Sequence, residues 1–201
     1  REGLDHAGRL SQASPPDAEE VGPVAWTEWQ SAMDFLFPRG VRAYWKNTGL
    51  SRLDEEVIEV LCARGAEQTW QGTAFDLHHM GGAFGRVDPH ATAFPDRYPQ
   101  FWLNVYGFWD SPADDERNIG FVRGLARDVE PFSAGGQYVN FMAREPGAPA
   151  ETPDDGAEAR RQALALYGAD RLERLTAVKR RYDPENVFRL NHNIPPVPVG
   201  A

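Results

Sequence analysis

The side chains of this sequence best suited to chemistry are a phenol, an amide and a carboxylate. Tyr138 and Asn140 stand two positions apart after Gly135-Gly136, so in a strand they would project side by side from one face. Asp76 lies inside a second apolar segment, where a carboxylate is costly to bury without a partner. For Tyr138 the alternative is a buried phenol that makes one ordinary hydrogen bond.

The segment 101–109 is predicted to be a strand with two unlike faces. We assign its first face to the apolar core, and this face carries Phe101, Leu103, Val105 and Trp109. We interpret the second face as a pocket wall, and it carries Trp102, Asn104, Tyr106 and Phe108. The alternative is that this face is half exposed or packs on another layer.

Other motifs that carry chemistry are not found in the sequence. His78 and His79 are adjacent, so on a strand they point to opposite faces and cannot share a metal ion. The glycines of 81–85 lack the spacing of a dinucleotide fingerprint, and no P-loop or nucleophile elbow occurs. Cys62, the single cysteine, is predicted to lie on the buried face of a helix.

These candidate residues must be positioned by interleaved strands and helices. The predicted strands are 42–47, 68–80, 101–109 and 137–142. The predicted helices are 25–37, 51–63, 114–129, 157–167 and 170–182, with a break between the last two at Gly168. Mixed elements in this order predict an α+β fold.

Composition limits the possible partners. A formal net charge of −9 and a pI near 5.0 disfavour nucleic acid. No apolar run approaches the roughly 20 residues of a membrane span, and no leader opens the chain, so a soluble protein is expected and a cytoplasmic one favoured. Residues 1–24 are predicted to be a linker, 25–196 the folded domain and 197–201 a tail.

Several segments resemble flavin-dependent oxidoreductases of the berberine-bridge-enzyme-like family. The most specific is the C-terminal one, from Tyr167-Gly168 through the run from Arg171 to Pro196 with its Asp183-Pro184-Glu185-Asn186 turn. The segment 135–141 resembles the family's Tyr-x-Asn strand, and 75–78 resembles a strand of its oligosaccharide-oxidising members. The match extends over roughly 24–196.

The resemblance implies a large antiparallel sheet with helices covering one face, which forms the substrate-binding domain of a flavin-dependent oxidase. FAD would be held mostly by an N-terminal domain of the same polypeptide that precedes this chain. Tyr138 would be the catalytic base and Asp76 the carboxylate that assists it. The implied substrate-binding residues are Trp102, Asn104 and Tyr106, and the implied cofactor-binding residues are Asn140, Asn191 and Asn193.

The implied reaction oxidises an alcohol or amine carbon of a small-molecule substrate, with hydride transfer to flavin N5. The alternative is a stand-alone, non-catalytic α+β domain with a binding or structural role. Many relatives carry Phe-Pro-His-Arg where this chain has Phe94-Pro95-Asp96-Arg97, so a role of that histidine does not carry over. Tyr182 and Phe188 are expected to anchor the 191–193 segment in the core.

Overall fold

The computed structural model describes residues 8–9, 12, 15, 17, 21–32, 34–36, 39–94, 96–136, 138–142, 156–190 and 192–196. The chain divides into two compact units, 1–40 and 41–201. The first unit contains the helix α2 (Trp26–Ser31) and the 3-10 helix η1 (Asp34–Leu36). The predicted domain start at residue 25 falls within this unit, and the proposed domain limits stay a prediction.

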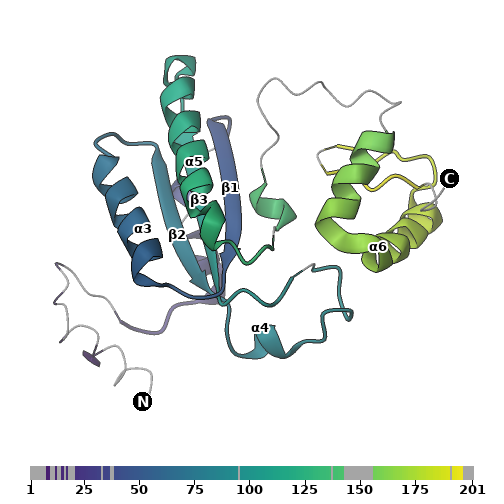
Figure 1. The fold of residues 1–201 in the computed structure, drawn as a ribbon, viewed down its shortest axis with the longest axis horizontal. Coiled ribbons are helices and arrows are strands. Elements are labelled where there is room, and N and C mark those ends of the chain that lie inside the picture. Colours follow the sequence, from purple (N-terminus) through teal and green to yellow (C-terminus); the bar gives the residue numbers. More distant parts are fainter. Residues whose placement is uncertain are drawn as a thin grey trace. The chain divides into compact units, whose positions relative to one another are not determined.

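The second unit is built on an antiparallel sheet with the strand order β1-β3-β2 (Figure 1). Its strands are β1 (Arg42–Leu50), β2 (Thr73–His79) and β3 (Phe101–Trp109). The register places Asn47 of β1 and Asp76 of β2 directly opposite Asn104 of the central strand. Directly opposed side chains lie on the same face of a sheet, so these three share one face.

Two helices, α3 (Glu55–Glu67) and α5 (Asp115–Val129), cover the other face (Figure 1). The core between sheet and helices is formed by Tyr44, Leu50, Val57, Leu61, Leu103, Val105, Trp109, Phe121, Val122, Leu125 and Val129. The predicted core face of the 101–109 strand is therefore confirmed. So is the α+β class with helices on one face of an antiparallel sheet; within the described residues this sheet has three strands.

Charged side chains fix the position of α5. Arg42 at the start of β1 donates two hydrogen bonds to Asp115 at the start of α5, at 2.6 and 2.7 Å. The indole of Trp109 donates to the same carboxylate at 2.6 Å. These hydrogen bonds, with that of Arg42 the strongest influence, hold the pKa of Asp115 below its usual range. One carboxylate thus joins α5 to two strands.

The remaining short elements connect the main ones. They are α4 (Ala83–Arg86), η2 (Pro112–Asp114), η3 (Glu130–Phe132) and η4 (Val139–Phe141). Of the helices in the described part of the chain, none is long and apolar enough to cross a membrane.

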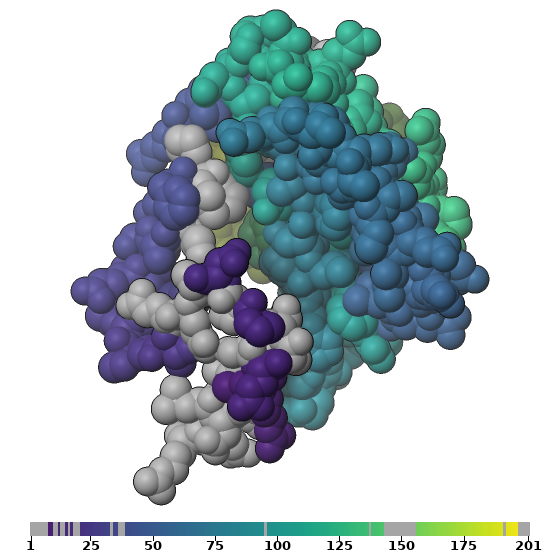
Figure 2. Space-filling view, turned by 90° about the vertical axis from the view of Figure 1, so that its left-hand side faces the viewer, coloured from purple at the N-terminus to yellow at the C-terminus, as the bar shows by residue number. Residues whose placement is uncertain are grey.

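The prediction that Cys62 is buried is wrong. Val57 and Leu61 of α3 face the core, whereas Cys62 is exposed. Successive residues of a helix are about 100° apart, so the position after a buried residue can already face the solvent. Figure 2 views the molecule from the side of α3, whose outer surface forms part of the blue area.

The C-terminal helix α6 (Gly156–Tyr182) breaks at Gly168, where φ is 73°, as the sequence predicted. Its buried positions include Leu172 and Thr176, which lie one turn apart. Tyr182 and Phe188 are 72% and 81% exposed, so the prediction that they anchor the chain end in the core is wrong. The buried side of this helix includes Leu172 and Thr176 but does not extend to Tyr182.

The prediction of a strand over 137–142 is also wrong for the described residues. Gly49 of β1 exchanges backbone hydrogen bonds with Ala134 and Gly135, at 2.8 and 3.0 Å. Gly135 and Gly136 then have φ values of 79° and 77°, which redirect the chain, and η4 follows. Gln137 lies outside the described residues. The segment therefore pairs with β1 only as far as Gly135.

Gly49 makes this pairing possible, which gives a first prediction. A Cβ at this position would lie 2.4 Å from Pro99 Cγ and 2.5 Å from the carbonyl oxygen of Gly135. We expect Gly49→Ala to lower the free energy of unfolding by about 1–3 kcal/mol or more, measured by urea denaturation. Gly120→Ala on α5, where no atom lies within 4 Å of the added Cβ, is the matched control and should stabilise by about 0.5–1 kcal/mol. Equal stability of the two variants would contradict the close approach.

Candidate functional site

The sheet face opposite α3 and α5 gathers polar and aromatic side chains from all three strands. By strand register it carries Trp45, Asn47, Asp76, His78, Trp102, Asn104, Tyr106 and Phe108. This set, named the open face from here on, contains every site residue that the sequence analysis took from 101–109 and from β2. The same register that buries the core side chains brings these residues together.

A polar group lies at the centre of the open face. Asn104 donates from Nδ2 to Asp76 Oδ1 at 2.9 Å, and His78 Nε2 lies 3.0 Å from the same oxygen. Tyr106 lies near Asp76 on the same face. Burial raises the pKa of the Tyr106 phenol, and the negative charge of Asp76 raises that pKa further. The partners that Asp76 was predicted to need are thus Asn104 and His78.

An aromatic layer covers one end of this group. Phe94 stacks on Trp102, with ring centroids 5.2 Å apart and ring planes inclined at 28°. The ring of Tyr138 lies 5.2 Å from Phe94 and 5.5 Å from Trp102, and Phe141 packs edge-on against Tyr138 at 5.3 Å. Trp102 is only 1% exposed beneath these rings. It therefore supports Tyr138 in this structure, and its direct contact with a substrate stays a prediction.

Tyr138 and Asn140 lie together, as proposed, but by a different geometry. Asn140 donates from Nδ2 to the phenol oxygen of Tyr138 at 2.7 Å. In a strand Phe141 would have pointed to the opposite face, whereas the η4 turn brings it against Tyr138. The described residues show no hydrogen bond between Asp76 and Tyr138, so the proposed assistance is not a direct contact here.

Buried polar atoms without a hydrogen-bond partner mark where the open face could receive a ligand. They include Asn104 Oδ1, Trp102 Nε1 and both side-chain polar atoms of Asn47. Asn193 Oδ1, near the C-terminus, is another. Buried polar groups normally have partners, which ordered water or a bound group can supply.

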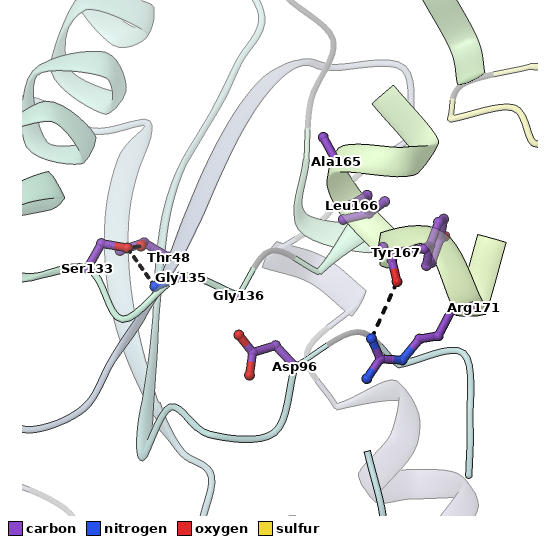
Figure 3. A pocket seen from close by; sticks show the side chains of 10 residues that line it. Thr48, Asp96, Ser133, Gly135, Gly136, Ala165, Leu166, Tyr167 and Arg171 are labelled. Atoms are coloured by element: carbon purple, nitrogen blue, oxygen red, sulfur yellow. Dashed lines mark hydrogen bonds between the residues drawn. The ribbon is translucent and has the colours of Figure 1, made fainter. Parts of the chain in front are cut away.

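A cavity of about 360 Å³ lies beside the Gly135-Gly136 turn (Figure 3). Its lining includes Asp96, Tyr167 and Arg171, so it brings a carboxylate, a phenol and a guanidinium to one space. Burial raises the pKa of the Tyr167 phenol, and the electrostatic influence of Tyr138 raises it further. Asp96 is the residue that replaces the histidine of the Phe-Pro-His-Arg pattern.

The C-terminal cofactor-binding predictions are only partly covered by the structure. Asn191 lies outside the described residues. His192 contacts the carbonyl oxygen of Met142 through Nε2 at 3.1 Å, next to η4. Asn193 is half-buried, and its role toward a cofactor stays a prediction.

Two aromatic residues of this site were missed from the sequence. Trp45 lies 5.0 Å from Tyr106 and 5.7 Å from Phe141, and the alternation of the 42–47 strand could have placed it on the open face. Phe94 comes from the loop before β3, and no periodic pattern exists there that could have placed its ring on Trp102. Loop contacts of this kind are decided by the packing of distant segments.

Comparisons with known proteins agree on one class. Residues 137–195 match the family model described as berberine and berberine like. The FAD-linked oxidoreductase YvdP of Bacillus subtilis, itself uncharacterised, is 31% identical over 142 residues, which are 71% of this chain and 28% of that protein. This chain is therefore similar to a protein of the FAD-linked oxidoreductase class.

Solved structures show the same fold. The berberine bridge enzyme of Eschscholzia californica superposes with a TM-score of 0.72 at 17% identity, over 98% of this chain and 44% of the enzyme. The carbohydrate oxidase of Microdochium nivale gives 0.63 at 20% identity, over 98% of this chain and 43% of the oxidase. The resemblance to the berberine-bridge-enzyme-like family is confirmed, and the chain is a relative of its FAD-linked oxidoreductases. It spans less than half the length of these proteins.

The open face fits the edge of a flavin ring system. Such an edge presents both hydrogen-bond donors and acceptors beside a flat aromatic surface. The unpartnered atoms of the open face are likewise of both kinds, since Asn104 offers an acceptor, Trp102 a donor and Asn47 both. The aromatic side chains around them supply a matching apolar surface.

The raised pKa of Tyr106 gives a second prediction. The folded protein keeps the phenol proton to a higher pH than the unfolded chain does, so the stabilisation is present below about pH 10 and is lost as pH rises through the folded pKa. The free energy of unfolding should therefore fall between about pH 9 and pH 11. Urea denaturation across this range should show a smaller fall for Tyr106→Phe. Tyr98→Phe, which changes a 77% exposed side chain, is the control and should follow the wild type.

Proposed function

We propose that these residues form the substrate side of an FAD-dependent oxidoreductase that oxidises an alcohol or amine carbon, with Tyr138 as the base. The observation that carries the proposal is the position of Tyr138. Its phenol oxygen accepts a hydrogen bond from Asn140 at one edge of an open face that holds unpartnered buried polar atoms. The kinship with FAD-linked oxidoreductases supports the cofactor.

Asn140, Asn191 and Asn193 would contact the cofactor, while Asn104 of the open face would contact the substrate. When bound, FAD supplies the hydride acceptor at its N5 atom, so the substrate carbon loses a hydride while its hydroxyl or amine loses a proton. An N-terminal domain of the same polypeptide would hold the rest of the cofactor. The length of the relatives supports such a domain, since this chain spans 44% of the Eschscholzia enzyme.

The two phenols of the site are suited to different tasks. Tyr106 is partly buried beside Asp76, and burial together with the carboxylate's charge opposes loss of the Tyr106 proton. Tyr138 has an amide donor at its oxygen instead, and an N–H donor stabilises negative charge on that atom. We therefore assign the proton of the substrate to Tyr138, while Tyr106 stays neutral and binds the substrate or orients Asp76.

Asp76 acts on the site through its neighbours. Its carboxylate holds Asn104 in place, which fixes the polar part of the open face. In the proposed reaction Trp102 supports the ring of Tyr138 from below. A base supported in this way loses less entropy when it meets the substrate.

The third prediction concerns this base. In the complete polypeptide, Tyr138→Phe should keep the fold and the flavin but lower the rate of flavin reduction by about a hundredfold or more, because only the proton acceptor is removed. Anaerobic stopped-flow absorbance isolates this step. A panel of oligosaccharides beginning with cellobiose, followed by aromatic alcohols and amines, provides the substrate, and the compound that reduces the flavin fastest is used.

Tyr98→Phe serves as the control because that phenol is 77% exposed. It should reduce at the wild-type rate. If Tyr138→Phe also reduces within a few-fold of the wild type with full flavin content, Tyr138 is not the base, and the proton acceptor must be sought elsewhere on the open face.

The fourth prediction concerns the isolated chain of 201 residues. It should bind FAD weakly, because its sequence has no glycine-rich pyrophosphate loop and its net charge of −9 repels the phosphates. Fluorescence titration with FAD measures this affinity. Stoichiometric binding below about 1 μM, or about −8 kcal/mol, would show that these residues hold the cofactor by themselves.

A further inference from the structure

His78 has a partner that the proposed reaction does not use. On β2, Asp76 and His78 stand two residues apart and so point to the same face of the sheet. Asp76 Oδ1 and His78 Nε2 are 3.0 Å apart. The imidazole lies edge-on to the ring of Phe141 at 6.0 Å, and Phe141 in turn packs against Tyr138. The carboxylate–imidazole pair and Tyr138 thus flank the same aromatic ring.

The carboxylate fixes which nitrogen of His78 carries the proton. A carboxylate oxygen and a ring nitrogen both carry lone pairs, so at 3.0 Å they need a hydrogen between them, and only Nε2 can supply it. The amide of Asn104 lies 3.3 Å from Nε2 but donates to Asp76 at the shorter distance of 2.9 Å. The reverse amide orientation would set its oxygen against the carboxylate oxygen, which is unfavourable.

A neutral imidazole with its proton on Nε2 has a lone pair on Nδ1. That atom can accept a proton, and the resulting imidazolium would be stabilised by the adjacent carboxylate. The side chain of His78 is 47% exposed, so a proton on it can be exchanged with solvent. The group is built as an orienting carboxylate, an imidazole and an accessible proton acceptor, the arrangement that general acid–base catalysis uses.

We propose that Asp76 and His78 form a second acid–base pair of the site, in which His78 Nδ1 receives the proton that the substrate has given to Tyr138. This proposal rests on the proposed function. The O–H bond of Tyr138 breaks, a bond forms between that proton and Nδ1 by way of solvent, and His78 then releases the proton to bulk water. No electrons are transferred in this step, and Tyr138 can then accept the next proton.

Asp76 is a positioning residue in this arrangement, because it acts through His78. Replacing it by asparagine reverses the hydrogen bond, since an amide NH₂ can donate to Nε2 and so favour the proton on Nδ1. His78→Gln has the complementary effect. The glutamine NH₂ group can still donate to Asp76, but glutamine offers no basic nitrogen. The variant therefore separates two roles of His78, holding Asp76 in place and accepting a proton.

The test uses the complete flavin-loaded polypeptide labelled with ¹⁵N-histidine. Nitrogen NMR should show His78 neutral with the proton on Nε2, and Asp76→Asn should move it to Nδ1; His78→Gln assigns the signal. His192 is an internal control, because its Nε2 faces the carbonyl oxygen of Met142 and must donate in both proteins. A wild-type His78 with its proton on Nδ1, or a tautomer that Asp76→Asn leaves unchanged, would overturn the proposal.

Kinetics separate this proposal from the proposed function. His78→Gln should retain the flavin and thermal stability but reduce turnover by about tenfold or more, at the lower end of general acid–base effects. Wild-type turnover in His78→Gln would overturn the acid–base role of His78. The base assignment fails independently, by an unchanged reduction rate in Tyr138→Phe, and that result would leave the His78 tautomer as measured.

Discussion

β3 pairs with β1 along one edge and with β2 along the other, and its register decides which side chains of the sheet meet. Asn104 stands directly between Asn47 and Asp76, while its neighbours Leu103 and Val105 point into the core. Because side chains alternate along a strand, a slip of one residue would exchange the two faces. The cost of exposing the core residues therefore holds the polar group on the open face.

The position of Tyr138 depends on the close approach of the 133–136 segment to β1. Gly49 lets the chain pair there, since a side chain at that position would overlap Gly135, and the two glycines that follow turn the chain with positive φ. The η4 turn then sets Tyr138 and Phe141 on the same side, where both contact Trp102. Backbone geometry thus positions the phenol, and the aromatic contacts stabilise its place.

Electrostatics give the two phenols of the site unlike character. Tyr106 lies beside the Asp76 carboxylate, whereas the oxygen of Tyr138 receives a hydrogen bond from the Asn140 amide. A charge on the first oxygen would be opposed by Asp76, and a charge on the second would be stabilised by the amide dipole. Two chemically identical side chains on neighbouring segments are in this way suited to a neutral and to a basic role.

The sequence by itself determined the main helices and the two faces of β3, because a period of two with one apolar side has a single buried solution. It also gave the break at Gly168, where the positive φ suits glycine. Only the tertiary structure decided that Asp76 pairs with Asn104, which is 28 residues away in the sequence. It likewise decided the turn at Tyr138 and the exposure of Cys62 and Tyr182, because periodicity predicts a helix or strand, whereas the face that is covered depends on which distant segments pack against it.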